Sequence, residues 1–250
     1  MSHFISKVVL SAVVSATLLA SSKVTFNNPD EAIKRLKEGN ARFVRGKSIH
    51  PHTDMKRIKE TKGGQKPFVT MTTCSDSRVP LERVFDQGIG DMFIIRVAGN
   101  VSDIDEAGSI EYGTDHLGTG LVVIVGHTSC GAVTAVASGA HVTGNIPRLV
   151  DNIVPAVKKV QARHEHESYD KWLGEAIEEN VWQSIEDLLY NSSTVKHLVQ
   201  DGKVKIVGAI YDIGTGKVKF MGEHPHLKEL LETKHVTHSS SKSAEPFLLK

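Results

Sequence analysis

Cysteine, net charge and long apolar segments are all scarce in this sequence. Its 250 residues include only two cysteines, too few for a small protein stabilised by a disulfide framework. The 30 Lys and Arg residues nearly balance the 29 Asp and Glu residues, and the formal charge is +1. Because no broad field of one sign attracts nucleic acid or acidic lipid, we expect a small-molecule partner and no nucleic acid.

The most hydrophobic segment near the N-terminus is too short to span a bilayer, which requires ~20 apolar residues. It runs from Val8 to Ala20 and leads into Ala20-Ser21-Ser22, small residues that suit a cleavage site. These features predict that residues 1–22 are an export signal and that the mature protein is periplasmic or secreted. The alternative is a buried N-terminal helix of a cytoplasmic protein. Neither reading includes a stable membrane span.

Internal repeats and domain-separating linkers are also missing from the sequence. A chain of 250 residues that is 40% hydrophobic can bury a substantial core as one domain. We therefore expect a single domain over residues 23–234. The tail at 235–250, which contains Ser239-Ser240-Ser241, is expected to be mobile.

Short β-prone segments alternate with segments of helical spacing. The expected strands are residues 67–73, 92–97, 121–125 and 204–210, followed by an edge strand at 217–221. Residues 121–125 are apolar at every position, which is typical of a parallel strand covered on both faces. The predicted fold class is α/β, with a mainly parallel sheet of four strands plus an antiparallel edge strand, flanked by helices. The tight turn Gly214-Thr215-Gly216 makes the last strand antiparallel.

Helix signals occur in several parts of the sequence. Asn28 and Pro29 form a helix start, and the apolar stripe that follows extends to Gly39. Residues 46–66 are polar and are interpreted as a connecting loop. Helices are also expected at 132–136 and 181–189.

Two segments concentrate reactive side chains, and each follows a predicted strand. The first is Cys74-Ser75-Asp76-Ser77-Arg78, and the second is Gly126-His127-Thr128-Ser129-Cys130-Gly131. The carboxyl ends of parallel strands line the crevice where ligands bind in this class of sheet. We therefore expect both segments to face one crevice.

Thiolate and imidazole are ligands that zinc prefers. The spacing of His127 and Cys130 lets one strand-to-helix turn direct both at one ion, and Cys74 supplies a third ligand. Three protein ligands leave a fourth position open, which is the arrangement of a catalytic zinc site. A disulfide or two unrelated thiols remain alternatives, although neither requires the surrounding Asp76 and Arg78.

The two segments together resemble the paired motif of β-class carbonic anhydrases. Similar segments occur at residues 40–43, 64–67, 99–100, 109–112 and 208–218, so the resemblance covers roughly residues 28–222. It implies reversible hydration of carbon dioxide to bicarbonate and a proton. It also implies one Zn²⁺ per chain, bound by Cys74, His127 and Cys130.

The resemblance also assigns a role to Asp76 and Arg78. In this family, zinc-bound hydroxide attacks carbon dioxide, and carbonic anhydrase is itself the usual example of a zinc ion acidifying its water. Asp76, held by Arg78, is expected to orient and deprotonate the zinc-bound water. If Asp76 releases Arg78, it can occupy the fourth zinc position and close the site.

The substrate pocket of the family maps onto five further residues. Gln65 is expected to hydrogen-bond substrate, Gly131 to supply a backbone amide, and Phe93, Ala98 and Tyr112 to form an apolar pocket. Part of this set comes from a neighbouring chain in the family, so a homodimer or larger homo-oligomer is expected.

Two departures from the family pattern limit the resemblance. Val97 stands where many members have asparagine, which removes a polar group near the pocket. The only tryptophans, Trp172 and Trp182, lie far from the N-terminal position that bicarbonate-inhibited members use, so we expect no such regulatory site.

Two other functions remain open at this level. One is a hydrolase with the same fold and metal site that acts on carbon disulfide or a similar linear molecule. The other is a zinc-binding module without catalysis, which the presence of both Asp76 and Arg78 disfavours.

Overall fold

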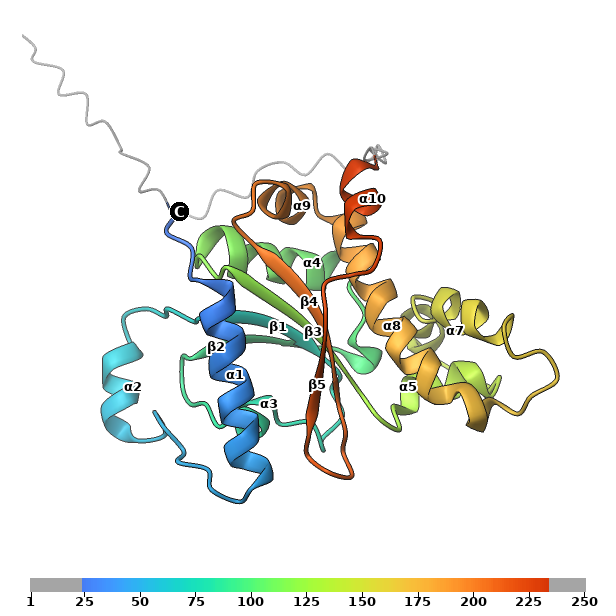
Figure 1. The fold of residues 1–250 in the computed structure, drawn as a ribbon, viewed down its shortest axis with the longest axis horizontal. Coiled ribbons are helices and arrows are strands. Elements are labelled where there is room, and N and C mark those ends of the chain that lie inside the picture. Colours follow the sequence, from blue (N-terminus) through green and yellow to red (C-terminus); the bar gives the residue numbers. More distant parts are fainter. Residues whose placement is uncertain (1–23, 234–250) are drawn as a thin grey trace, which may run out of the picture.

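A computed structural model describes residues 24–233 of the chain (Figure 1). The expected export signal at 1–22 and the expected mobile tail at 235–250 lie outside the described residues. Within 24–233, no helix has both the length and the apolar character needed to cross a membrane.

The centre of the molecule is a five-stranded sheet in the order β2-β1-β3-β4-β5. The strands are β1 (Val69–Thr73), β2 (Met92–Arg96), β3 (Leu121–His127), β4 (Lys205–Tyr211) and β5 (Val218–Gly222). The first four pair in parallel, and β5 pairs with β4 in the antiparallel sense. The predicted fold class is confirmed.

Helices cover both faces of this sheet (Figure 1). The helices are α1 (Pro29–Val44), α2 (Met55–Thr61), α3 (Leu81–Val84), α4 (Ile104–Glu111), α5 (Gly131–Ala137), α6 (Ile146–Val150), α7 (Val154–Gln161), α8 (Tyr169–Asn191), α9 (Ser193–Gln200) and α10 (Leu227–Glu232). Two single turns, η1 (Ala98–Asn100) and η2 (Tyr112–His116), complete the elements. Helices α1 and α3 pack on one face, and α4, α5, α7, α8 and α9 contribute to the core on the other.

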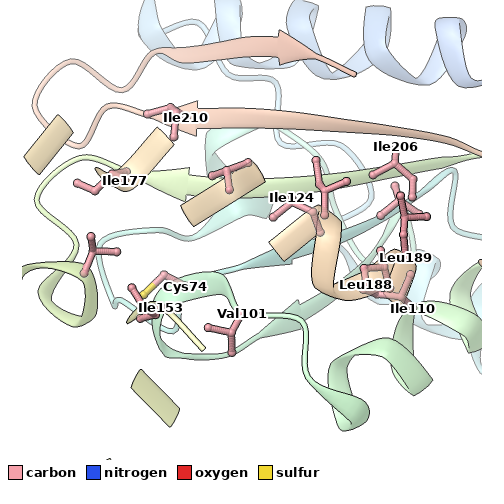
Figure 2. Close-up of a cluster of buried hydrophobic side chains, with 14 of the residues drawn as sticks. Cys74, Val101, Ile110, Ile124, Ile153, Ile177, Leu188, Leu189, Ile206 and Ile210 are labelled. Carbon is pink, nitrogen blue, oxygen red and sulfur yellow. The ribbon is translucent and has the colours of Figure 1, made fainter. Parts of the chain in front are cut away.

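Strand β3 shows why the sheet is covered on both sides. Its apolar residues alternate between two buried clusters: Val122 and Ile124 pack against α8, whereas Leu121, Val123 and Val125 pack with α1 and α3. All of β3 is buried. Figure 2 shows Ile124 in the first cluster, together with Ile177 and Leu188 of α8. The uniformly apolar strand therefore forms the middle layer between two cores.

The N-terminal region differs from the sequence-based expectation in two places. Helix α1 begins where predicted, with the Asn28 side chain accepting hydrogen bonds from the amides of Asp30 and Glu31. It continues past Gly39 to Val44, because Gly39 is a close-packing position and not a stop: a Cβ there would lie 1.8 Å from the Phe85 carbonyl oxygen. The interpretation of residues 46–66 as a loop was wrong at 55–61, which form α2.

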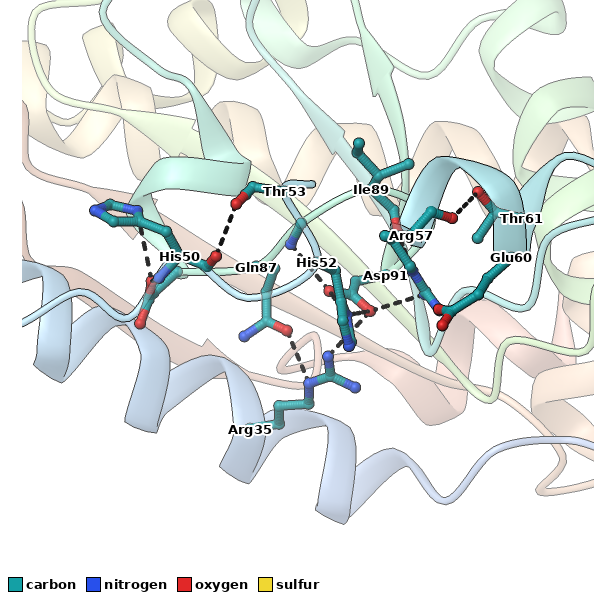
Figure 3. Close-up of polar contacts among 12 residues, drawn as sticks. Arg35, His50, His52, Thr53, Arg57, Glu60, Thr61, Gln87, Ile89 and Asp91 are labelled. Atoms are coloured by element: carbon teal, nitrogen blue, oxygen red, sulfur yellow. Dashed lines mark hydrogen bonds and ion pairs between the residues drawn. The ribbon is translucent and has the colours of Figure 1, made fainter. Parts of the chain in front are cut away.

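Helix α2 has no buried residue, so it lacks the apolar stripe that predicts a helix. It is fixed instead by a buried carboxylate. Asp91, directly before β2, contacts Arg35 of α1 at 3.2 Å, Arg57 of α2 at 3.3 Å and His52 at 2.8 Å (Figure 3). The Gly88 amide donates a further hydrogen bond to it at 2.9 Å. These contacts join α1 and α2 to the amino-terminal edge of the sheet.

The strand order also creates the crevice predicted from the sequence. The chain passes from β1 to β2 on one side, yet β1 pairs with β3 on the other side. The connection after β1 leads to β2 on one side, and the connection after β3 leads to β4 on the other side. The carboxyl ends of β1 and β3 therefore form the position where ligands bind in open α/β sheets. Both reactive segments begin at these two strand ends.

Candidate active site

Three side chains that can bind a metal meet at the carboxyl ends of β1 and β3. Cys74 follows β1, His127 is the last residue of β3, and Cys130 is the N-cap of α5. The pairing of Thr73 with Val125 brings the two strand ends level. The ligand atoms of Cys74, His127 and Cys130 all lie within 4.8 Å of one another, and all three residues are buried. These three residues are called the metal cluster below. One ion with ligand bonds of about 2.0–2.3 Å bridges a group of this size.

The donor set fits zinc. The Nδ1 atom of His127 lies 2.9 Å from the Thr128 carbonyl oxygen, which fixes the ring orientation and leaves Nε2 as the free ligand atom. Nε2 is buried, and among residues 24–233 it has no hydrogen-bond partner. Both cysteines are free thiols. Two sulfurs beside an unsatisfied imidazole nitrogen suit a soft, tetrahedral ion such as zinc.

The two thiols influence each other's ionisation. Contact with the Cys130 thiol lowers the pKa of Cys74 to about 4 despite its burial, with a further contribution from His127. The contact with Cys74 and burial raise the pKa of Cys130 well above its usual range. Burial lowers the pKa of His127, but the neighbouring Cys74 sulfur outweighs this effect and raises it. The cluster therefore favours negative charge on Cys74, as a cation site requires.

Asp76 is held beside this cluster by Arg78. The Arg78 Nε atom lies 2.9 Å from Oδ1 of Asp76 and its Nη2 atom lies 2.7 Å from Oδ2, which is a bidentate pair. The Arg78 hydrogen bond holds the pKa of Asp76 well below its usual range. Oδ2 also lies 3.9 Å from Nε2 of His127. An ionised carboxylate therefore stands at the edge of the ligand group.

Arg96 supports this segment in a way that the motifs did not indicate. It ends β2, pairs with Thr73 of β1, and donates from Nη2 to the Asp76 carbonyl oxygen at 2.7 Å. The sequence signal that could have identified Arg96 was its position near the end of the strand expected at 92–97. Arg96 fixes the backbone of Asp76, while Arg78 fixes its side chain.

The five predicted pocket residues fall into two groups. Ala98 and Gly131 lie next to the metal cluster: Ala98 precedes Gly99, whose amide reaches the Cys74 sulfur, and Gly131 follows Cys130. Val97, the departure from the family pattern, makes backbone hydrogen bonds to Thr73 and Ser75.

Gln65, Phe93 and Tyr112 form the second group. Gln65 precedes β1, and Phe93 pairs with Thr70 near the start of that strand. Because a strand rises about 3.3 Å per residue, Thr70 lies about 13 Å along β1 from Cys74. Tyr112 lies against Phe93, with ring centroids 5.9 Å apart, and is 46% exposed. The structure does not bring these three residues to the metal cluster of their own chain.

A further polar residue of the site was missed at the sequence level. The Gly99 amide donates to the Cys74 sulfur at 3.4 Å, and Nδ2 of Asn180 donates to the Gly99 carbonyl oxygen at 2.8 Å. Asn180 lies on the buried stripe of α8. A polar residue on a stripe of apolar ones was the signal that could have identified it.

The family model described as carbonic anhydrase matches residues 69–218, which contain both motifs and the whole metal cluster. The chain belongs to the β-carbonic anhydrase family. Carbonic anhydrases catalyse the reversible hydration of carbon dioxide, so the chain is an enzyme of this class and not a zinc-binding module without catalysis.

Individual carbonic anhydrases agree with this assignment. Carbonic anhydrase 2 of Mycobacterium tuberculosis is 37% identical over 194 residues, which cover 76% of this chain and 91% of that protein. The β-carbonic anhydrase CafA of Aspergillus fumigatus superposes with a TM-score of 0.64 at 28% identity and covers 81% of this chain and 96% of its own. A tetrameric β-carbonic anhydrase of Sordaria macrospora, 24% identical, shares the fold with a TM-score of 0.60 over 77% of this chain and 98% of its own.

Proposed function

We propose that this carbonic anhydrase uses one zinc ion per chain, bound by Cys74, His127 and Cys130, to hydrate carbon dioxide. The observation that carries the proposal is the unsatisfied, buried Nε2 atom of His127 between two buried thiols, with an ionised carboxylate 3.9 Å away. A zinc ion bound there supplies a Lewis acid that lowers the pKa of a coordinated water, an effect for which carbonic anhydrase is the usual example.

Asp76 acts in this proposal as an acceptor. Its Oδ2 atom accepts a hydrogen bond from the reacting water and turns a lone pair of that water towards carbon dioxide. Because Arg78 keeps the pKa of Asp76 low, the carboxylate stays ionised and available to accept this hydrogen bond. The side chain of Asp76 is 16% exposed, which leaves a route to water. Through the bidentate pair, Arg78 keeps the carboxylate of Asp76 turned towards its own guanidinium group.

We also propose that a second copy of the chain completes the substrate pocket. Gln65, Phe93 and Tyr112 lie towards the amino end of β1, away from the metal cluster at its carboxyl end. Strand β2 forms the adjacent edge of the sheet. A homodimer, alone or within a larger assembly, would place these residues of one chain near the metal cluster of the other, where carbon dioxide and bicarbonate bind.

Export remains a proposal that depends on residues 1–22 alone. The apolar segment from Val8 to Ala20 and the small residues after it support a periplasmic or secreted enzyme. The N-terminal residue of the protein recovered from cells tests this directly: a start near Lys23 supports export, and an intact Met1 contradicts it.

Zinc analysis combined with stopped-flow measurement of carbon dioxide hydration tests the proposed function. We expect about one zinc per chain and rapid hydration in the wild-type protein. Cys74→Ser removes a thiolate ligand and is expected to lose both the metal and the activity. A parallel assay with carbon disulfide tests the other substrate class. Hydrolysis of carbon disulfide without carbon dioxide hydration would overturn the proposal.

A further inference from the structure

Asn180 is an unusual residue for its position in the molecule. It lies in the middle of α8 and is 1% exposed, on a buried face that also contains Ile177, Val181 and the polar Ser184. Its Oδ1 atom is buried and has no hydrogen-bond partner within the described part of the chain. An unsatisfied buried amide oxygen costs free energy, so a residue of this type needs a compensating interaction on its other atom.

The compensating interaction leads to the metal cluster. Nδ2 of Asn180 donates to the Gly99 carbonyl oxygen at 2.8 Å, and the Gly99 amide donates to the Cys74 sulfur at 3.4 Å. The amide and the carbonyl lie in the two peptide planes that flank the Gly99 Cα atom, so holding the carbonyl limits the rotation about this glycine that would turn its amide away from the sulfur. Cys74 and Ile177 of α8 are both part of the buried cluster in Figure 2.

Gly99 depends on its surroundings to keep this orientation. Its φ angle is +75°, in the left-handed region, and a Cβ at this position would lie 2.5 Å from Cδ1 of Ile153. Glycine fits both the backbone angle and the space, but it is also the most flexible residue, and packing of a side chain cannot hold it. The hydrogen bond from Asn180 supplies the restraint.

We propose that Asn180 is a positioning residue for the metal centre: it holds the Gly99 carbonyl and so limits the rotation of this glycine, which keeps the Gly99 amide directed at the Cys74 sulfur. An N–H donor withdraws electron density from a thiolate, so the bound metal becomes a stronger Lewis acid. Hydrogen bonds to ligand sulfurs tune metal sites in this way in other proteins. The inference rests on the proposed function, because it concerns the ligand environment of the same metal.

Cobalt substitution gives a readout that a purely structural role would not change. The thiolate-to-cobalt charge-transfer band reports the energy of the sulfur electrons. In Asn180→Leu, which keeps the number and branching of the side-chain heavy atoms but removes the donor, we expect this band to move to lower energy, because a sulfur without its N–H donor gives up electrons more easily. We also expect about ten-fold weaker zinc binding in competition with a chelator, since loss of an outer-shell partner typically costs 10–100-fold.

A matched control separates this effect from general destabilisation. Ile185 is fully buried on the same helix and in the same apolar cluster. Ile185→Ala should lower the thermal stability but leave the cobalt band and the zinc affinity of the folded protein unchanged. If Asn180→Leu does not fold, Asn180→Ala removes the same donor without adding branched bulk and takes its place.

The outcomes for this inference and for the proposed function are distinct. A wild-type protein that binds neither cobalt nor zinc contradicts the proposed function. A wild-type protein that binds both, with an Asn180→Leu variant of identical cobalt spectrum and zinc affinity, overturns the positioning role alone. Equal spectral shifts in Asn180→Leu and Ile185→Ala overturn it as well, because the effect would then be a general one.

Discussion

Asp76 and Asp91 are both held by arginine, but in opposite ways. Asp76 has one arginine partner two residues along the chain, whose side chain is 54% exposed. Asp91, 4% exposed, is held by two arginines, a histidine and a backbone amide. A carboxylate with one exposed partner can change partner, whereas a carboxylate held by several elements cannot. The carboxylate beside the three metal-binding side chains is therefore placed in the less constrained environment.

The largest expected effect comes from Asp91 and concerns stability. Asp91→Ala leaves Arg35, Arg57 and His52 without their shared anion and should lower the free energy of unfolding by about 3 kcal/mol, because hydrogen bonds to a charged group contribute about 1.5–3 kcal/mol each and several are lost at once. Chemical denaturation measures the loss.

The zinc content of the folded fraction should stay unchanged, because Asp91 lies at the opposite end of the strands from Cys74, His127 and Cys130. Glu60→Gln is the matched control. Glu60 pairs with the same Arg57 at 3.8 Å but is 48% exposed, so its loss should change stability by less than about 1 kcal/mol. A loss of zinc from the folded Asp91→Ala protein would contradict the proposed division between the two aspartates.

The second effect comes from Asp76 and concerns turnover. Asp76→Asn removes the anionic acceptor and should reduce carbon dioxide hydration about 100-fold, within the range for positioned proton-transfer groups. The zinc content should stay at the wild-type level, because Asp76 is not one of the three proposed ligands. Stability should change little, since the Arg78 partner is largely exposed. A fully active Asp76→Asn variant would remove the role assigned to Asp76.

The smallest effect comes from Asp187, whose hydrogen-bond partner is the neutral amide of Gln183 at 2.9 Å. Burial raises the pKa of Asp187 from 3.8 to about 6. The unfolded chain therefore releases this proton at lower pH than the folded chain, and stability falls as the pH rises between these values. At about 1.4 kcal/mol per pH unit the full shift corresponds to about 3 kcal/mol at pH 8. Because Asp187 is only partly buried and water screens part of this effect, Asp187→Asn should be more stable than the wild type by about 1 kcal/mol.

Denaturation of both proteins at pH 8 and at about pH 3 tests this sign. The difference should vanish below the unfolded pKa of 3.8, where Asp187 is protonated in both the folded and the unfolded chain. Asp201→Asn is the control, because Asp201 is exposed and paired with Lys203. An Asp187→Asn protein that gains no stability at pH 8 would show that its carboxylate is better solvated than its position suggests.

Much of the fold could be predicted because it depends on local patterns. Runs of β-prone residues gave the four parallel strands, and the turn at 214–216 gave the antiparallel edge strand. The uniformly apolar β3 indicated a strand covered on both faces. The segments carrying Cys74, His127 and Cys130 follow strands that the pattern identified, so their meeting at one edge of the sheet followed from the fold class. The positions of these three residues relative to the strands can be inferred from the sequence without knowledge of distant contacts.

The parts that the sequence did not reveal depend on contacts between distant residues. Helix α2 has no apolar stripe and is held by Asp91, 34 residues from Arg57. Asn180 acts on Gly99 across 81 residues, and no motif joins them. The family pattern named Gln65, Phe93 and Tyr112 together with Ala98 and Gly131, but only the register of β1 and β2 places these groups at opposite ends of a strand.

The separation of these two groups along β1 makes the proposed catalytic unit larger than the chain that encodes it. If a second copy supplies Gln65, Phe93 and Tyr112, dilution below the dissociation constant of the assembly removes complete pockets while every chain remains folded and metal-loaded. Catalytic output then depends on local enzyme concentration as well as on substrate. Cells could therefore change the activity through the amount of protein present in one compartment, without any change to the metal centre.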